Sequence, residues 1–303
     1  DTSESPSGRW FGDGVLNACE NAVDRHVAAG YGDRTALVHV SAMTGAERRY
    51  SYSELQSEVA QLAGALRRIG VGVGDRVILY MPMVPEAVFA MLACARLGAI
   101  HSVVFGGFAA RELAARIDDA QPAALLSASC GLEPGRVVDY HGLVQRALEL
   151  ASHAPSHCIV LQREQGRADL DPARFTDWQA FLRDAEPADP VPMPSTAPLY
   201  VLYTSGTTGR PKGVLRDTGS YLTALAWSMT NVYATGPGET FWAASDIGWV
   251  VGHSYIVYGP LLQGCTTILF EGKPVGTPDA GTYWRVVEQH RVKTLFTAPT
   301  AIR

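Results

Sequence analysis

The sequence predicts an α/β fold of two similar subdomains, each a mostly parallel sheet flanked by helices. Three observations lead to this prediction. Strands alternate with amphipathic helices, the strands are apolar at successive positions, and a proline-rich segment interrupts the pattern at residues 184–198. Continuous apolar strands are typical of parallel sheets, because helices cover both faces of such sheets. The chain has 303 residues, 47% of them hydrophobic, which is more than one small domain requires.

The first subdomain is expected over residues 1–183. Residues 35–50 predict two short strands, and Ser51 with Glu54 forms a capping-box pattern at the start of a helix. From residue 75 to residue 129 the chain alternates strand, helix, strand, helix and strand. Gly98 is expected to end the first of these two helices. The pattern weakens from about residue 130 to residue 185.

Residues 184–198 contain five prolines and little periodicity, so we expect a linker there. The second subdomain is expected over residues 199–303, where the strand–helix rhythm returns. Its last apolar run, residues 294–299, predicts a strand close to the end of the sequence. We therefore expect this subdomain to be incomplete.

Composition excludes several classes of function. Net charge is −5 and no Lys/Arg-rich run occurs, so nucleic acid is not an expected partner. No apolar run of about 18 residues or more predicts a membrane-spanning helix. The five cysteines are scattered without a CxxC pair, which argues against a zinc site or disulfide framework. A reducing compartment is expected: the cytoplasm, or the mitochondrial matrix in a eukaryote. The sequence leaves the oligomeric state open.

A loop rich in glycine and hydroxyl side chains follows the predicted strand at residues 199–203. Glycines let backbone N–H groups approach a ligand closely, and successive N–H groups can form an anion-binding nest. A lysine after the loop can add a positive charge. The pattern is not a Walker A motif, and such clusters also occur as ordinary loops. As candidate phosphate-binding residues we select Thr204, Ser205, Gly206, Thr207, Thr208, Gly209 and Lys212.

The motif "YTSGTTGRPKGV" resembles the phosphate-loop signature of adenylate-forming enzymes. The segments "VVFGGF", "ASDIGWVVGHSYIVYGPLLQGCTTILFEG" and "TAPTAIR" resemble the short-chain acyl-CoA synthetases, and the propionyl-CoA branch more than the acetyl-CoA branch. The resemblance implies a truncated form of the family's large N-terminal domain. It also implies ATP, Mg²⁺ and CoA as substrates and cofactor, and activation of propionate or acetate through an acyl-adenylate.

The resemblance also implies roles for particular residues. Trp249, Val250, Val251 and Gly252 match the segment that lines the acyl pocket. Residues matching stretches near CoA are Phe105, Gly106, Gly107, Glu133, Pro134, Gly135 and Arg136, of which only Arg136 is a plausible phosphate partner. Read alone, "GWVVG" fits a packed core better than a pocket, and Phe105 to Gly107 fit a simple turn equally well.

His253 is a candidate general acid or base. The substrate carboxylate is already ionised at neutral pH, however, so the reaction needs neither. We expect His253, like His101 and His290, to be packed, and Asp246 to cap the segment that follows it. The family's later elements, including the C-terminal lid domain with its catalytic lysine, have no match here. We therefore expect no catalytic residue in this chain and little activity from it alone.

Three alternatives remain open at this point. A nucleotide-binding pseudoenzyme or fragment would bind without turnover. An adenylating relative would use another acid or acceptor. A P-loop phosphohydrolase is disfavoured by the motif mismatch.

Overall fold

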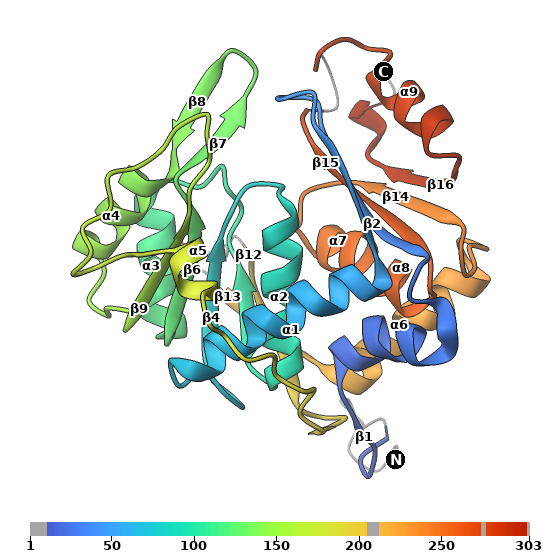
Figure 1. Cartoon of the computed structure of the whole chain (residues 1–303), viewed down its shortest axis with the longest axis horizontal. Helices are drawn as coiled ribbons and strands as arrows, with labels where there is room; N and C mark the ends of the chain where they lie inside the picture. The colour runs from blue at the N-terminus through green and yellow to red at the C-terminus, as the bar shows by residue number, and fades with distance from the viewer. Residues whose placement is uncertain (1–10, 205–211, 274–276, 302–303) are drawn as a thin grey trace.

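The computed structural model describes residues 11–204, 212–273 and 277–301, and these form two large sheets, with helices between and around them, and two small two-stranded ones (Figure 1). The predicted α/β class is confirmed. The first sheet has the order β10-β9-β6-β4-β5-β12-β13, and every neighbouring pair is parallel except β12 and β13. Its strands are β4 (Arg76–Tyr80), β5 (Ile100–Val103), β6 (Ala124–Ala128), β9 (His157–Leu161), β10 (Thr176–Asp177), β12 (Pro198–Thr204) and β13 (Lys212–Asp217).

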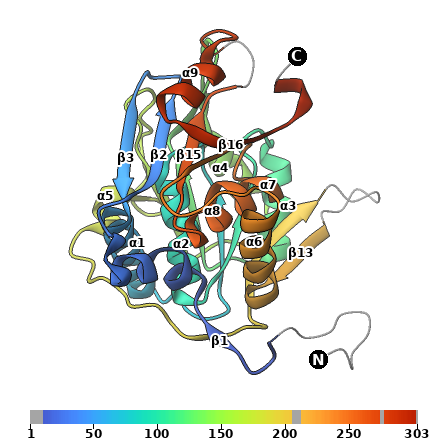
Figure 2. The ribbon, with the colours of Figure 1, turned by 90° about the vertical axis from the view of Figure 1, so that its right-hand side faces the viewer.

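The second sheet has the order β16-β14-β15-β2-β3, in which only β2 and β3 pair antiparallel. Figure 2 shows this sheet from its edge strand β3 through β2 and β15 to the opposite edge strand β16. Its strands are β2 (Thr35–Ser41), β3 (Glu47–Ser51), β14 (Thr240–Ala244), β15 (Thr266–Glu271) and β16 (Val292–Thr297).

Neither sheet is confined to one side of residues 184–198. The early strands β2 and β3 join the second sheet, while the later strands β12 and β13 complete the first. The boundaries between subdomains remain a prediction. Each of the two large sheets contains strands from both sides of residues 184–198. The 184–198 segment also contains β11 (Met193–Pro194), which pairs with β1 (Val15–Leu16) near the start of the chain.

Helix α2 (Pro85–Leu97) lies between the two sheets and is buried along its length except at Glu86. Its partner α1 (Tyr52–Arg68) begins with the predicted Ser51–Glu54 capping box. Side chains of the first sheet alternate between faces, as strand geometry requires: Val77 belongs to the core shared with α2, and Ile78 to the core beneath α3 and α4. The remaining helices are α3 (Ala110–Ala120), α4 (Tyr140–Leu150), α5 (Trp178–Leu182), α6 (Thr218–Asn231), α7 (Val250–Gly252), α8 (Gly259–Leu262) and α9 (Thr282–Gln289), with the short π- or 3₁₀-helical segments η1 (Glu20–Asp24), η2 (Val27–Tyr31), η3 (His253–Tyr258) and η4 (Pro299–Ala301).

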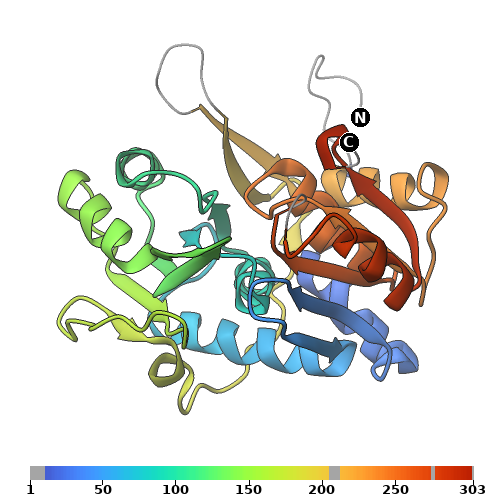
Figure 3. The ribbon, with the colours of Figure 1, turned by 90° about the horizontal axis from the view of Figure 1, so that it is seen from above.

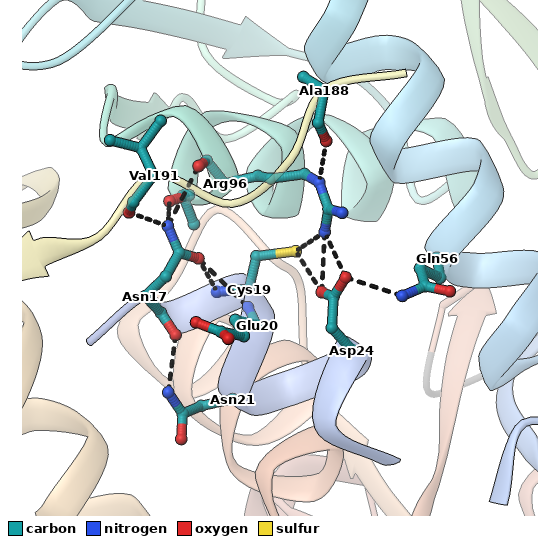
Figure 4. A network of polar contacts seen from close by, with 10 residues as sticks. Asn17, Cys19, Glu20, Asn21, Asp24, Gln56, Arg96, Ala188 and Val191 are labelled. Carbon is teal, nitrogen blue, oxygen red and sulfur yellow. Dashed lines mark hydrogen bonds and ion pairs between the residues drawn. The ribbon is translucent and has the colours of Figure 1, made fainter. Parts of the chain in front are cut away.

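A buried polar network ties the early chain to α2 and to the 184–198 segment (Figure 4). Arg96 forms an ion pair with Asp24, with 2.7 Å between Nη1 and Oδ2, and donates from Nε to the carbonyl of Ala188. The amide of Asn17 donates to the carbonyl of Val191 at 2.8 Å. Three stretches distant in sequence are thereby held together, so the predicted linker is bound to the body of the protein.

All five cysteines are free and buried, and burial raises their thiol pKa values. No helix among the described residues has the length and apolar character needed to cross a bilayer.

Candidate functional site

The predicted phosphate loop joins two paired strands at the rim of the first sheet. Thr204 ends β12, Lys212 begins β13, and the two are directly opposite one another in the antiparallel pair. Both are exposed, and the β12–β13 pair projects from the body of the molecule (Figure 3). In open α/β sheets, ligands bind outside the carboxyl ends of the strands, which is where Thr204 lies. The other predicted residues, Ser205, Gly206, Thr207, Thr208 and Gly209, lie outside the described residues.

A cavity of about 320 Å³ opens beyond the carboxyl end of β5. Phe105, Gly106 and Gly107 line one side of it, and Glu133 and Arg136 of the β7–β8 hairpin line another. The hairpin strands are β7 (Cys130–Glu133) and β8 (Arg136–Asp139). The structure therefore brings together the two segments that the sequence assigned to CoA. Pro134 and Gly135 line a neighbouring cavity at the hairpin turn, together with Glu133 and Arg136.

The two glycines after Phe105 are required by close packing. A Cβ on Gly106 would lie 2.0 Å from the hydroxyl oxygen of Tyr140, and a Cβ on Gly107 would lie 2.4 Å from the Phe105 ring. Contacts this short do not occur for real side chains, so any other residue would displace its neighbour. The turn predicted here is thus also a place where the backbone must approach aromatic side chains.

Three charged side chains meet at this cavity. Glu133 accepts hydrogen bonds from Arg136, with 2.8 Å from Nε to Oε2, and from Lys273, with 3.2 Å from Nζ to Oε1. The Arg136 bonds, and then the Lys273 bond, lower the pKa of Glu133. Lys273 follows β15 of the second sheet and was not selected from the sequence. A phosphate could replace the Glu133 carboxylate between these two cations.

Asp246 lies between β14 and the helical segment that follows it, and its side chain lines the same cavity. Its Oδ1 accepts a hydrogen bond from the backbone N–H of Gly248 at 2.7 Å. The prediction that Asp246 caps the following segment is wrong, because the helix α7 (Val250–Gly252) has Trp249 at its N-cap and no side-chain cap, and the Asp246 bond closes the turn before it. Burial raises the pKa of Asp246 to about 6, only partly opposed by the Gly248 bond.

The predicted acyl segment does not line a single pocket. The Trp249 ring lies 5.3 Å from the Phe105 ring, at the rim of the cavity just described. Val250 instead lines a second cavity of about 610 Å³ between β13, α6 and α7. Val251 packs against the main core, and Gly252 is buried where a Cβ would lie 2.0 Å from the Asp246 carbonyl oxygen. Val250 thus lines the second cavity, while its neighbour Trp249 contacts Phe105, which lines the first.

Two buried histidines lie behind this segment. His253 Nδ1 donates to the carbonyl of Trp249 at 3.0 Å, and burial lowers the pKa of His253 to about 4. The His101 ring stacks on His253 with 5.4 Å between centroids, and its Nε2 contacts the Tyr258 hydroxyl at 2.7 Å. Both imidazoles are therefore neutral at neutral pH. They are packed, as the sequence predicts, as is His290.

The protein is of the α/β class, and its first cavity opens beyond the carboxyl end of a parallel strand, where such folds bind ligands. Residues 24–303 match the family model described as AMP-binding enzyme. The chain belongs to this family.

The chain is also similar to two proteins of known name and to one solved structure. The chain is 54% identical over all of its length to the human mitochondrial acyl-CoA synthetase short-chain family member 3, covering 44% of that protein. It is 47% identical to propionate–CoA ligase of Escherichia coli, over 100% of the chain and 48% of the ligase. The acetoacetyl-CoA synthetase structure from Streptomyces lividans matches with a TM-score of 0.88 and 28% identity, over 98% of this chain and 45% of that one. The chain therefore spans about half the length of the relatives it matches.

Sequence reasoning missed Lys273 and the residues of the second cavity that come from α6. A signal for Lys273 was present, because a cation directly after an apolar strand lies at the ligand-binding edge of a parallel sheet. No comparable signal marked the α6 residues, whose positions depend on how the helix packs against η3 (His253–Tyr258).

Proposed function

We propose that the chain forms part of the active site of an ATP-dependent short-chain acyl-CoA synthetase, an acid–thiol ligase. The enzyme would join propionate or acetate to AMP, release pyrophosphate, and pass the acyl group to the thiol of CoA. The observation that carries this proposal is a link between two cavities: the Trp249 ring lies 5.3 Å from Phe105, which lines the first, and the next residue, Val250, lines the second. Phe105 follows β5, which pairs with β12, so the first cavity lies near the strand end where the phosphate loop begins.

The acid would occupy the cavity beside Val250. Its wall includes Leu225 and Trp227 of α6, which suit an aliphatic chain, and the cation Arg216 lines it beside the carboxylate Asp217. Adenylation joins a carboxylate oxygen of the acid to the α-phosphorus of ATP and releases pyrophosphate, so that AMP, a good leaving group, takes the place of oxide, a poor one. The protein's main task is then to align the acid with the α-phosphorus of ATP and to neutralise the phosphates.

ATP would place its phosphates at the loop between Thr204 and Lys212, with Mg²⁺ sharing the neutralisation of charge. CoA would enter at the Phe105–Gly107 cavity, with a phosphate near Arg136 and Lys273. In this arrangement Trp249 stands between the thiol acceptor and the acid. We assign no catalytic side chain within the chain.

The similarity to a propionate–CoA ligase supports propionate, rather than acetate, as the acid. One methylene distinguishes the two acids and is worth only about 1–3 kcal/mol of discrimination, so the preference has to be measured. The test is carboxylate-dependent exchange of pyrophosphate into ATP by the full-length protein, with acetate, propionate and butyrate compared side by side. Preferred exchange with propionate supports the proposal, whereas preferred exchange with a different class of acid supports the adenylating-relative alternative.

ATP binding without exchange for any acid would instead support a nucleotide-binding pseudoenzyme. Because the chain covers less than half of the two curated relatives, we also propose that residues 1–303 alone turn over slowly or not at all. The same assay on the 303-residue chain tests this. The proposed compartment is the cytoplasm, or the mitochondrial matrix if the source is eukaryotic.

A further inference from the structure

The cavity beside Val250 has a buried inner side and an exposed outer side. Tyr221 and Ser254 line it and are 9% and 5% exposed, whereas Val250 and Trp227, which also line it, are 44% and 61% exposed. A molecule entering from solvent therefore passes Val250 and Trp227 first and meets Tyr221 and Ser254 last.

We propose that Tyr221 and Ser254 form the inner wall of the acyl pocket and set the length of the acid it accepts, an inference that rests on the proposed function. The two residues come from different elements, α6 and η3, and their hydroxyl oxygens lie 2.9 Å apart in a hydrogen bond. This bond closes the space between the elements at the bottom of the cavity.

The wall is held rigidly from behind. The Tyr221 ring packs edge-on against Tyr200, with 5.2 Å between centroids, and against Tyr258, with 5.9 Å. Tyr258 is in turn held by its 2.7 Å contact with His101. Protein interiors are close-packed, so Tyr221 cannot withdraw without displacing these buried rings. A longer acid would have to disrupt that packing to enter.

The wall also suits an aliphatic chain rather than a polar one. Burial raises the pKa of Tyr221 well above its ordinary value, so the phenol remains neutral. Its hydroxyl hydrogen-bonds to that of Ser254, so one of the two O–H donors at the end of the cavity is already used. The side walls that lead to it include Leu225 and Ala224.

The test replaces the wall in the full-length protein. Tyr221→Ala should raise the ratio of kcat/KM for valerate over propionate by about tenfold or more, since each methylene that finds new apolar space contributes to binding. Tyr221→Phe keeps the ring and should change this ratio by less than about threefold. The ratio is measured by pyrophosphate exchange with each acid under identical conditions.

A matched control is Leu222→Ala, the next residue on α6, which is also buried but does not line the cavity. It should lower stability while leaving the ratio unchanged. If Tyr221→Ala does not fold, Tyr221→Leu removes the phenol while keeping a buried apolar side chain, and should shift the ratio in the same direction by a smaller factor.

The outcomes separate the two proposals. An active wild-type protein whose acid ratio is the same in the Tyr221 and Leu222 variants overturns the inner wall but keeps the proposed function. A folded wild-type protein that exchanges pyrophosphate with no acid overturns the proposed function, and this inference with it.

Discussion

Arg163 and Glu271 form a buried, two-pronged ion pair that connects the two sheets: Nη1 lies 2.7 Å from Oε1, and Nη2 lies 3.0 Å from Oε2. Arg163 follows β9 of the first sheet, and Glu271 ends β15 of the second. Ser41 at the end of β2 donates a third hydrogen bond to Glu271 at 2.7 Å. Because Glu271 also lines the cavity at Gly106, the pair fixes the distance between the two walls of that cavity.

Breaking this pair should destabilise the protein strongly. Arg163→Met leaves the Glu271 carboxylate buried without its cation, which typically costs about 3–5 kcal/mol. The double variant Arg163→Met/Glu271→Leu removes both charges and should recover much of that loss. Urea unfolding measures each free energy. Arg146→Ala, which breaks the exposed pair with Glu149, is the control and should cost about 0–1 kcal/mol. Equal losses at the two pairs would show that the buried pair contributes no more than a surface one.

The charges around Glu133 should govern affinity for CoA. Glu133→Gln removes the carboxylate that occupies Arg136 and Lys273, so KM for CoA should fall by about two- to fivefold, while Lys273→Ala should raise KM by a similar factor. Both effects should weaken at high salt, because exposed charges are screened. Pantetheine, an acceptor without phosphates, is the control: its KM should not change in either variant. A parallel change for both acceptors would contradict a phosphate contact.

Local sequence patterns were sufficient to predict much of this fold, because the signals for helix start and end are local. The Ser51–Glu54 box and the left-handed Gly98 that ends α2 are where they were expected. Strand partners were not predictable in the same way. Strand β2 pairs with β15, more than 200 residues away, and β13, largely exposed and next to a glycine-rich loop, has no apolar signature.

The candidate site shows the same limit. Phe105 to Gly107 and Arg136 share a cavity as expected, but Lys273 reaches it only because β15 and the β7–β8 hairpin end close together. Trp249 and Val250 are adjacent in sequence and were assigned to one pocket, yet only Val250 lines the second cavity, while the Trp249 ring packs against Phe105. Which way each side chain faces depends on tertiary packing against Phe105 and α6, and sequence patterns do not encode that packing residue by residue.

Gly252 should tolerate no side chain. Its Cβ would lie 2.0 Å from the carbonyl oxygen of Asp246, a backbone atom that cannot move without displacing the whole turn. Gly252→Ala should therefore cost about 1–3 kcal/mol, the usual cost of overpacking. Gly72→Ala is the matched control, because a Cβ there meets nothing within 4 Å, and it should be neutral or slightly stabilising. Thermal unfolding compares the two, and similar melting temperatures would contradict the tight turn.

Asp246 should make stability fall as pH rises through the mildly acidic range. Its pKa is raised from the ordinary value of 3.8 to about 6 in the folded protein, so the folded state holds the proton more tightly than the unfolded chain does. Below pH 3.8 both states are protonated, and the carboxyl carries no penalty. Between pH 3.8 and about pH 6 the unfolded state ionises first, so the free energy of unfolding decreases, by about 1–3 kcal/mol in total.

Asp246→Asn keeps an oxygen that can accept the Gly248 N–H but cannot ionise. The variant should match the wild type near pH 4 and exceed its stability above pH 6 by about the same 1–3 kcal/mol. Urea unfolding of both proteins from pH 4 to pH 8 measures the difference. A constant difference across this range would mean that Asp246 titrates alike in the folded and unfolded states. If the difference instead grows as predicted, the ionised carboxylate is held at a cost to stability, as is typical of groups kept in place for binding or catalysis.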